Sequence, residues 1–157
     1  LTFDTAETRL PVNATNGFVL TTNDATADGI EWAVIPSPAV TLSFVLACSD
    51  ETSDLTTGTK VTFRMPYNFT LTDVRGSLTT AATGTDLTTV DIQQGGTTVL
   101  STKITLDASE TTSTTAATPP VISTSALTND SIITIIIDQI GNTTTGAGLK
   151  VYLIGTT

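Results

Sequence analysis

The alternation of hydrophobic and polar positions is most distinctive in residues 131–140, Ser-Ile-Ile-Thr-Ile-Ile-Ile-Asp-Gln-Ile. The segment is rich in β-branched residues, which fit an extended strand better than a helix. Because successive side chains of a strand point to opposite faces, one face carries Ile132, Thr134 and Ile136. The other face carries a row of isoleucines: Ile133, Ile135 and Ile137. Neither face suits water, so the pattern predicts a strand that is covered on both sides.

Two kinds of cover satisfy this pattern, namely a second layer of the same chain or a second copy of the chain. We favour the copy and expect one face of the strand to lie in an oligomer interface. The residues chosen for that interface are Ile133, Ile135 and Ile137. On this hypothesis Ile135→Asp prevents assembly, because an unpaired buried charge is costly.

The same kind of pattern recurs along the chain from residue 40 onward. Eight strands are expected, at residues 41–48, 60–65, 69–80, 87–93, 98–106, 121–123, 131–140 and 149–154. A shift of the apolar phase predicts a bulge within residues 73–76, and Gly95-Gly96 predicts a tight hairpin. No segment has a convincing helical pattern. The sequence therefore predicts an all-β fold, an antiparallel β-sandwich of jelly-roll type.

Residues 1–39 differ from the rest in their pattern. They contain Pro11, Pro36 and Pro38, several glycines, and too few apolar residues to form a core alone. We expect an extended stalk at 1–39, ordered by contact with identical copies, followed by a tip domain at 40–157. Because the sequence opens at Leu1 without methionine, we also expect it to be part of a longer polypeptide.

The lengths of the connections predict where recognition occurs. If the strands run up and down, the short turns fall at one end, and the long connections at 49–59, 81–86, 107–119 and 141–148 fall at the other. Loops held by a rigid scaffold commonly carry binding residues. The candidate receptor-facing residues are Asp50, Glu51, Asp54, Asp86, Asp107, Glu110 and Asn142.

Composition narrows the classes of function. The net charge is −9, the pI is about 4.1, and the six basic residues are scattered, which argues against nucleic acid as a partner. Charged residues make up only 13% of the chain and the mean hydropathy is +0.22, which indicates surface buried between subunits. Threonine accounts for about a quarter of the residues, a composition typical of β-proteins. No apolar run reaches the length of a membrane span, so no membrane insertion is expected.

The sequence offers little catalytic chemistry. It has no histidine, which removes Ser-His-Asp and Cys-His arrangements and the usual zinc ligands. The single cysteine, Cys48, lies in phase with core positions and is interpreted as a small buried side chain. We interpret Asp50, Glu51 and Asp54 as a solvated acidic loop, so no catalytic site, metal site or cofactor is expected. A cation shared between loops or subunits at Asp86, Asp107 and Glu110 is the alternative. Trp32 and Tyr67 could form an aromatic sugar platform, but we interpret both as packing residues.

Several segments resemble bacteriophage proteins. The N-terminal ones are similar to a short linker of phage tail-fibre proteins, and the later ones to C-terminal domains of virion fibre proteins. The N-terminal segments are Arg9-Leu-Pro-Val, Asn16-Gly-Phe-Val-Leu-Thr-Thr and Gly29-Ile-Glu-Trp-Ala. The later segments are Ala47-Cys-Ser-Asp-Glu-Thr, Val61-Thr-Phe-Arg-Met-Pro-Tyr, Asp91-Ile, Leu100-Ser-Thr-Lys and Gly148-Leu-Lys-Val-Tyr-Leu-Ile-Gly.

The resemblance implies a parallel homotrimer in the virion, joined to other virion proteins on its N-terminal side. The expected function is a non-enzymatic tail-fibre tip that adsorbs to a bacterial surface receptor, most simply a polysaccharide. One alternative is a capsid decoration or head-fibre protein that stabilises or adorns the shell. A third hypothesis, from another class, is a glycan-cleaving enzyme.

Overall fold

The computed structural model describes residues 18–22, 30–34 and 40–157. The chain divides into two compact units, Leu1–Pro38 and Ala39–Thr157. The expected boundary between stalk and tip, after residue 39, lies one residue from this division. Each unit is described by itself below.

In the first unit, β1 (Phe18–Thr22) pairs antiparallel with β2 (Ile30–Val34). The register runs from Phe18 opposite Val34 to Thr22 opposite Ile30. The expected extended segment did not include this hairpin. The other residues of the expected stalk, and the side chain of Trp32, lie outside the described residues.

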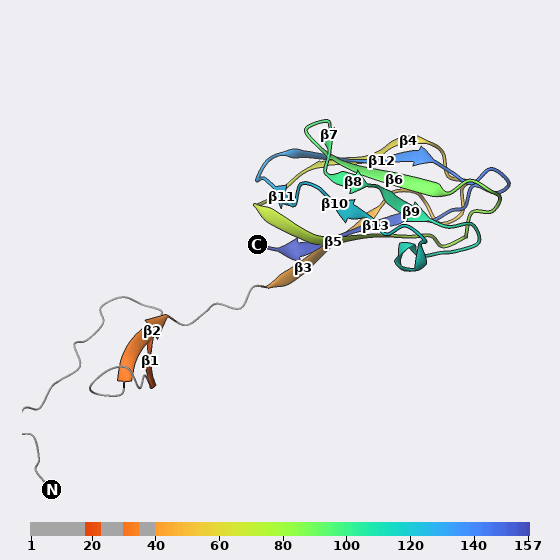
Figure 1. Cartoon of the computed structure of the whole chain (residues 1–157). Coiled ribbons are helices and arrows are strands. Elements are labelled where there is room, and N and C mark those ends of the chain that lie inside the picture. The colour runs from red at the N-terminus through yellow and green to blue at the C-terminus, as the bar shows by residue number, and fades with distance from the viewer. Residues whose placement is uncertain (1–17, 23–29, 35–39) are drawn as a thin grey trace, which may run out of the picture. The chain divides into compact units, whose positions relative to one another are not determined.

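The second unit contains two main sheets, which form the lower and upper layers in Figure 1. The first sheet has the order β11-β5-β13-β3 and the second has the order β4-β12-β6-β7, with β9 also paired to β6. The strands of the first sheet are β3 (Thr41–Ala47), β5 (Phe69–Ser77), β11 (Ala126–Leu127) and β13 (Lys150–Thr156). Those of the second are β4 (Gly58–Arg64), β6 (Thr88–Gln94), β7 (Thr97–Thr98), β9 (Ile104–Leu106) and β12 (Ile132–Gln139).

A further pair, β8 (Leu100–Thr102) with β10 (Val121–Ile122), lies between the two layers on one side (Figure 1). Every strand pairing in the described residues is antiparallel. The described part of the chain contains no α-helix, only the 3₁₀ turn η1 (Ser113–Thr115). The prediction of an all-β antiparallel fold is therefore confirmed.

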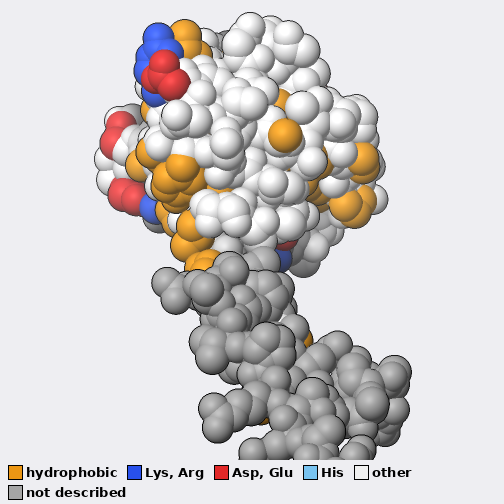
Figure 2. Space-filling view, turned by 90° about the vertical axis from the view of Figure 1, so that its left-hand side faces the viewer, with side chains coloured by type: hydrophobic (Ala, Val, Ile, Leu, Met, Phe, Trp, Pro, Cys, Tyr) orange, Lys and Arg blue, Asp and Glu red, His pale blue; other side chains and the backbone are white. Residues whose placement is uncertain are grey.

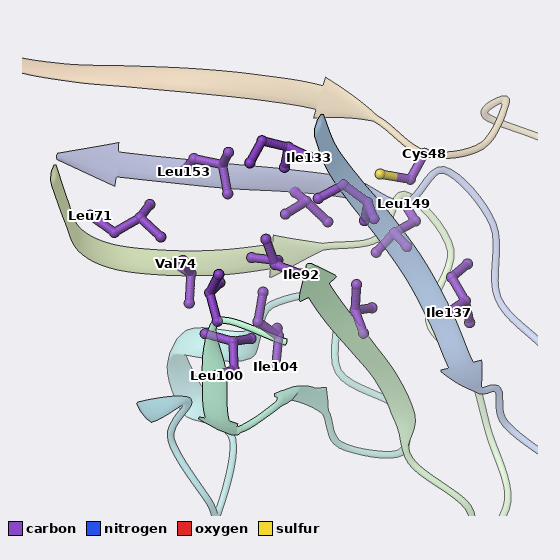
Figure 3. Packing of buried hydrophobic residues seen from close by; sticks show 14 of the residues in the cluster. Cys48, Leu71, Val74, Ile92, Leu100, Ile104, Ile133, Ile137, Leu149 and Leu153 are labelled. Carbon is purple, nitrogen blue, oxygen red and sulfur yellow. The ribbon is translucent and has the colours of Figure 1, made fainter. Parts of the chain in front are cut away.

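The core fills the space between the layers. Figure 3 shows side chains of the first sheet, such as Val74 and Leu153, pointing toward those of the second, such as Ile92 and Ile133. At about 25 cal/mol for each Å² of apolar surface removed from water, this cluster supplies the main driving force for folding.

The structure corrects the interface predicted on β12. Ile133, Ile135 and Ile137 are 0% exposed in the single chain, because the first sheet already covers them. No part of these side chains is left for a second copy to contact. The first sheet of the same chain covers this face. Cover by a second copy of the chain, which we favoured from the sequence, is therefore wrong for Ile133, Ile135 and Ile137. The opposite face is open at Ile132, which is 42% exposed, and half-buried at Ile136.

Two local predictions are confirmed. Gly95 and Gly96 join β6 to β7 with φ values of +60° and +86°, which a two-residue hairpin with both central residues at positive φ requires. In β5 the register passes from Asp73 opposite Ile154 to Leu71 opposite Gly155, so Thr72 is unpaired. This is the expected bulge, placed one residue before the predicted range.

Candidate functional site

The long connections meet at one end of the second unit, as their lengths predicted. Backbone hydrogen bonds join them directly: Leu55 N donates to Gly146 O, Gly148 N to Asp50 O, and Ser109 N to Ala82 O. Two isolated bridges add Thr80 opposite Ala147 and Thr83 opposite Thr144. We call this end, formed by residues 48–57, 78–87, 107–112 and 140–149, the loop end. Val40 enters β3 at the opposite end, since Thr41 lies beside Thr156.

The neighbouring acids Asp50 and Glu51 hold the loop end together. Asp50 Oδ1 accepts hydrogen bonds from Thr52 N at 2.9 Å and Ser53 N at 2.6 Å. The Ser53 amide, and then that of Thr52, lower the pKa of Asp50 to about 2. Glu51 Oε1 lies 2.6 Å from Lys150 Nζ, and Thr79 Oγ1 donates to Glu51 Oε2. The Lys150 ammonium, and then the Thr79 hydroxyl, hold the pKa of Glu51 below its ordinary value.

Three further candidates are also bonded within the loops. Asp107 Oδ2 accepts from Ala117 N at 2.9 Å, and Glu110 accepts from the hydroxyl of Thr115. Asn142 Oδ1 accepts from Thr85 N at 3.0 Å, while its Nδ2 donates to Thr85 Oγ1 at 2.9 Å. These hydrogen bonds stabilise the loops, and they occupy part of the hydrogen-bonding capacity that the three side chains could offer to a receptor.

Asp54 and Asp86 are the two candidates whose carboxylates have no hydrogen bond or ion pair within the described residues. Asp54 is exposed and Asp86 is half-buried. The structure therefore brings all seven predicted residues to one end of the unit but separates them by role. Five organise the loops, and two carboxylates are free to contact a ligand.

Neither a metal cluster nor a membrane helix is present in the described part of the chain. No group of three or more histidine, cysteine, aspartate or glutamate residues there could hold a metal ion. Within the same residues, no helix has the length and apolar character that crossing a membrane requires.

Cys48 and Tyr67 fit the packing roles expected of them. Cys48 is buried, and desolvation raises the pKa of its thiol to about 11, which makes the reactive thiolate scarce. The ring of Tyr67 lies 5.9 Å from that of Phe44, centroid to centroid, although Tyr67 is partly exposed.

A charged cluster that the sequence did not suggest lies on the outer face of the second sheet. Asp91 is only 2% exposed, and its carboxylate accepts from Gln93 Nε2 at 3.0 Å and from the hydroxyl of Thr98. Lys103 Nζ lies 3.6 Å from Asp91 Oδ2 and 2.6 Å from Asp138 Oδ2. Asp138, and to a smaller extent Asp91, raises the pKa of Lys103. A single acid between Val90 and Ile92 gives no periodic signal, which is why the cluster was missed.

The two sheets leave one side of the core incompletely covered. β3 and β4 are edge strands of their sheets, and several of their inward side chains are only half-buried. We call this side, with the outward Val45, the open edge. Its residues are Leu42, Phe44, Val45, Leu46, Val61 and Phe63.

The two strands of the open edge differ in their protection. β4 carries Lys60 and Arg64, and its register shifts opposite Ile135 and Ile136. β3 has no charged residue, no proline and an unbroken register along Thr41–Ala47. Charges, prolines and bulges are what normally keep an edge strand from pairing with another chain. β3 therefore lacks these features along the whole of its length.

Charged residues make up only 13% of the chain. On the face shown in Figure 2, white side chains and backbone dominate, and red and blue side chains are few.

The chain matches no known protein family, no curated protein and no solved structure.

Proposed function

We propose that this chain is a non-enzymatic virion structural protein of a bacteriophage, the trimeric tip of a tail fibre that adsorbs to bacterial surface polysaccharide. One observation carries the proposal: the interlinked long loops lie at the end of the second unit opposite to the entry of the chain at Val40. A domain attached to other virion proteins through its N-terminal side then presents those loops outward.

The strand order supports a jelly-roll β-sandwich for the tip domain. Strands β3, β4, β5 and β6 alternate between the first and second sheets, and β11, β12 and β13 alternate again. The final strand, β13, lies between β3 and β5, while β12 lies between β4 and β6. Two sheets connected in this way are the arrangement of jelly rolls, which occur in viral and lectin domains.

The open edge supports assembly from identical copies. An uncharged, regular edge strand beside half-buried aromatic residues exposes apolar surface and unpaired backbone groups, both of which association would remove from water. We propose that a second copy of the chain covers β3, and that the three copies of the trimer repeat this contact.

The chemistry of the acids supports a binding role over a catalytic one. A glycosidase needs one carboxyl group that can take up and release a proton and a second carboxylate across a cleft. Asp50 is held ionised by two backbone amides, and Glu51 by Lys150. Both carboxylates therefore stay ionised and are bonded within the loops, which does not suit a group that must take up and release a proton.

The direct test is adsorption competition with a phage whose virion carries this chain. Purified protein should occupy the bacterial receptor and reduce adsorption, and enzymatic removal of the surface polysaccharide should abolish that effect. Gold-labelled antibody should mark the ends of tail fibres. Label on heads without inhibition of adsorption would favour the capsid-decoration hypothesis. Release of oligosaccharide from host polysaccharide, lost in Asp54→Asn, would favour an enzyme.

A further inference from the structure

A pocket of about 270 Å³ lies against β5, and none of the seven predicted receptor residues lines it. It is lined by side chains of β5, of η1 and of the Pro-Pro segment that precedes β10. Its lining includes Asp73, Arg75, Ser113, Thr114, Pro119 and Pro120.

The pocket exists because β5 has no strand neighbour along part of its edge. Leu71 N donates to Ser125 O beside β11, and Leu78 N donates to Thr111 O beside η1. Between these points no strand of the described residues pairs with β5 on this side. The bulge at Thr72 lies in this gap and turns Asp73 to the outer face of the sheet.

Side chains replace the missing strand as hydrogen-bond partners. Asp73 Oδ1 accepts from Val74 N at 2.8 Å, and Ser113 Oγ accepts from Gly76 N at 2.8 Å. The backbone donors of this edge are therefore already satisfied, so the pocket does not invite a peptide strand. It is suited to a compact ligand that side chains recognise.

The polar groups in the pocket fit a neutral ligand with several hydroxyl groups. Arg75 Nε donates to Asp73 Oδ2 at 2.7 Å, so the two charges offset each other and an anion gains little. Within the described residues, the terminal nitrogens of Arg75 and the hydroxyl proton of Ser113 have no hydrogen-bond partner. The pocket thus offers a carboxylate acceptor beside several free donors, which is what adjacent sugar hydroxyls require.

The apolar part and the size of the pocket fit the same class. The rings of Pro119 and Pro120 line the pocket with rigid apolar surface. Such surface can pack against the C–H groups of a pyranose ring. A volume of about 270 Å³ lies at the lower limit of ligand pockets, which suits one sugar residue better than an extended chain.

We propose that this pocket binds one neutral sugar residue of the surface polysaccharide, with Asp73 and Arg75 contacting adjacent hydroxyls. This inference rests on the proposed adsorption function and adds to the loop end one sugar-binding site beside β5. Each site is weak alone, but copies of the pocket in one assembly bind a repeating polysaccharide through avidity.

Amide NMR on the isotopically labelled full chain tests the inference, with the methyl glycosides of glucose, galactose, mannose and rhamnose as probes. At least one glycoside should shift the amide signals of Val74, Gly76 and Thr114, because these amides border the pocket. Inorganic phosphate serves as the anionic probe and should not shift them. The absence of shifts with all four glycosides, or shifts with phosphate alone, overturns the inference.

Two variants and one control locate the site. Asp73→Asn keeps an oxygen for the Val74 amide but removes the carboxylate, and Arg75→Gln removes the guanidinium. Each should weaken glycoside binding by about tenfold or more, as expected for loss of a charged hydrogen-bond partner. The control Arg64→Gln removes an exposed guanidinium on β4, outside the pocket, and should bind as the unchanged chain does. Equal affinity in all three variants contradicts the proposal.

Adsorption competition with the same variants separates the two proposals. If the unchanged chain and Asp73→Asn inhibit phage adsorption equally, the pocket is wrong and the adsorption function stands. If a glycoside binds in the pocket but no chain inhibits adsorption, the pocket stands and the adsorption function is wrong.

Discussion

Lys103 neutralises the buried carboxylate of Asp91 across a distance of 3.6 Å between Nζ and Oδ2. Asp91 lies in β6, whereas Lys103 occupies the single position between β8 and β9. The ion pair therefore joins the connection between β8 and β9 to the outer face of the second sheet. The other hydrogen-bond donors to the Asp91 carboxylate in the described part of the chain are the uncharged side chains of Gln93 and Thr98.

Lys103→Met should destabilise the fold because it leaves Asp91 buried without a cation. Breaking one partner of a buried pair costs about 3–5 kcal/mol, and partial exposure of Lys103 reduces this to roughly 1–3 kcal/mol. Urea unfolding monitored by circular dichroism measures the change. Arg64→Met is the matched control, because the side chains of Arg64 and Asp130 are 61% and 74% exposed and such pairs contribute at most about 1 kcal/mol. Equal losses in the two variants would show that burial of Asp91 has no energetic role.

Val45→Lys should dissociate the proposed trimer without unfolding the chain. Val45 is 55% exposed on β3, at the open edge, where a charge opposes pairing with another copy. Val121→Lys is the control, since Val121 is 50% exposed on β10, away from that edge. Sedimentation velocity should report a smaller species for Val45→Lys alone. Ile135→Asp, in contrast, should unfold the single chain, because Ile135 lies in its core.

The loop end should lose stability in acid through Asp50. The pKa of this residue falls from 3.8 to about 2 on folding, because the amides of Ser53 and Thr52 donate to its carboxylate. A depressed pKa means that the contribution is complete above pH 3.8 and is lost as the pH falls toward 2. Asp50→Asn removes this titration, so its melting temperature should fall less than that of the unchanged chain over the same pH range. Differential scanning calorimetry makes the comparison, and parallel curves would contradict it.

Gly146→Ala should destabilise the loop end more than Gly95→Ala destabilises its hairpin. Both glycines have positive φ, +79° and +60°, so alanine pays about 1–2 kcal/mol at either position. At Gly146 a Cβ would also lie 2.9 Å from Thr80 O, whereas at Gly95 it meets nothing within 4 Å. Chemical unfolding should show a loss larger for Gly146→Ala by about 1 kcal/mol or more. Equal losses would mean that the bridge between Thr80 and Ala147 moves to accommodate the methyl group.

Most of the fold could be predicted because its longer strands have a clear period of two. The alternation in β3 and β12 was sufficient to locate both strands within one or two residues at each end. Residues 98–106 were expected to form one strand but form parts of three. The side-chain pattern continues through this segment while the partner changes from β6 to β10 and back to β6. A pattern along one strand carries no information about which strand lies beside it.

The candidate site was predicted in position but not in role. The lengths of the connections and the up-and-down direction of the strands placed Asp50 and Asn142 at the loop end, yet their hydrogen-bond partners come from the chain's folded geometry. The pocket beside β5 could not be predicted at all. It depends on where Ser113 meets Gly76, two residues that are 37 positions apart in the sequence.

The pairing of β3 with β13 has a consequence for synthesis. β3 hydrogen-bonds to no strand other than β13 within the described residues, and β13 is separated from it by about a hundred residues of intervening chain. During translation β3 therefore waits, unpaired, until residues 150–156 emerge from the ribosome. Throughout that interval the backbone groups of an uncharged strand are open to pairing with neighbouring nascent chains.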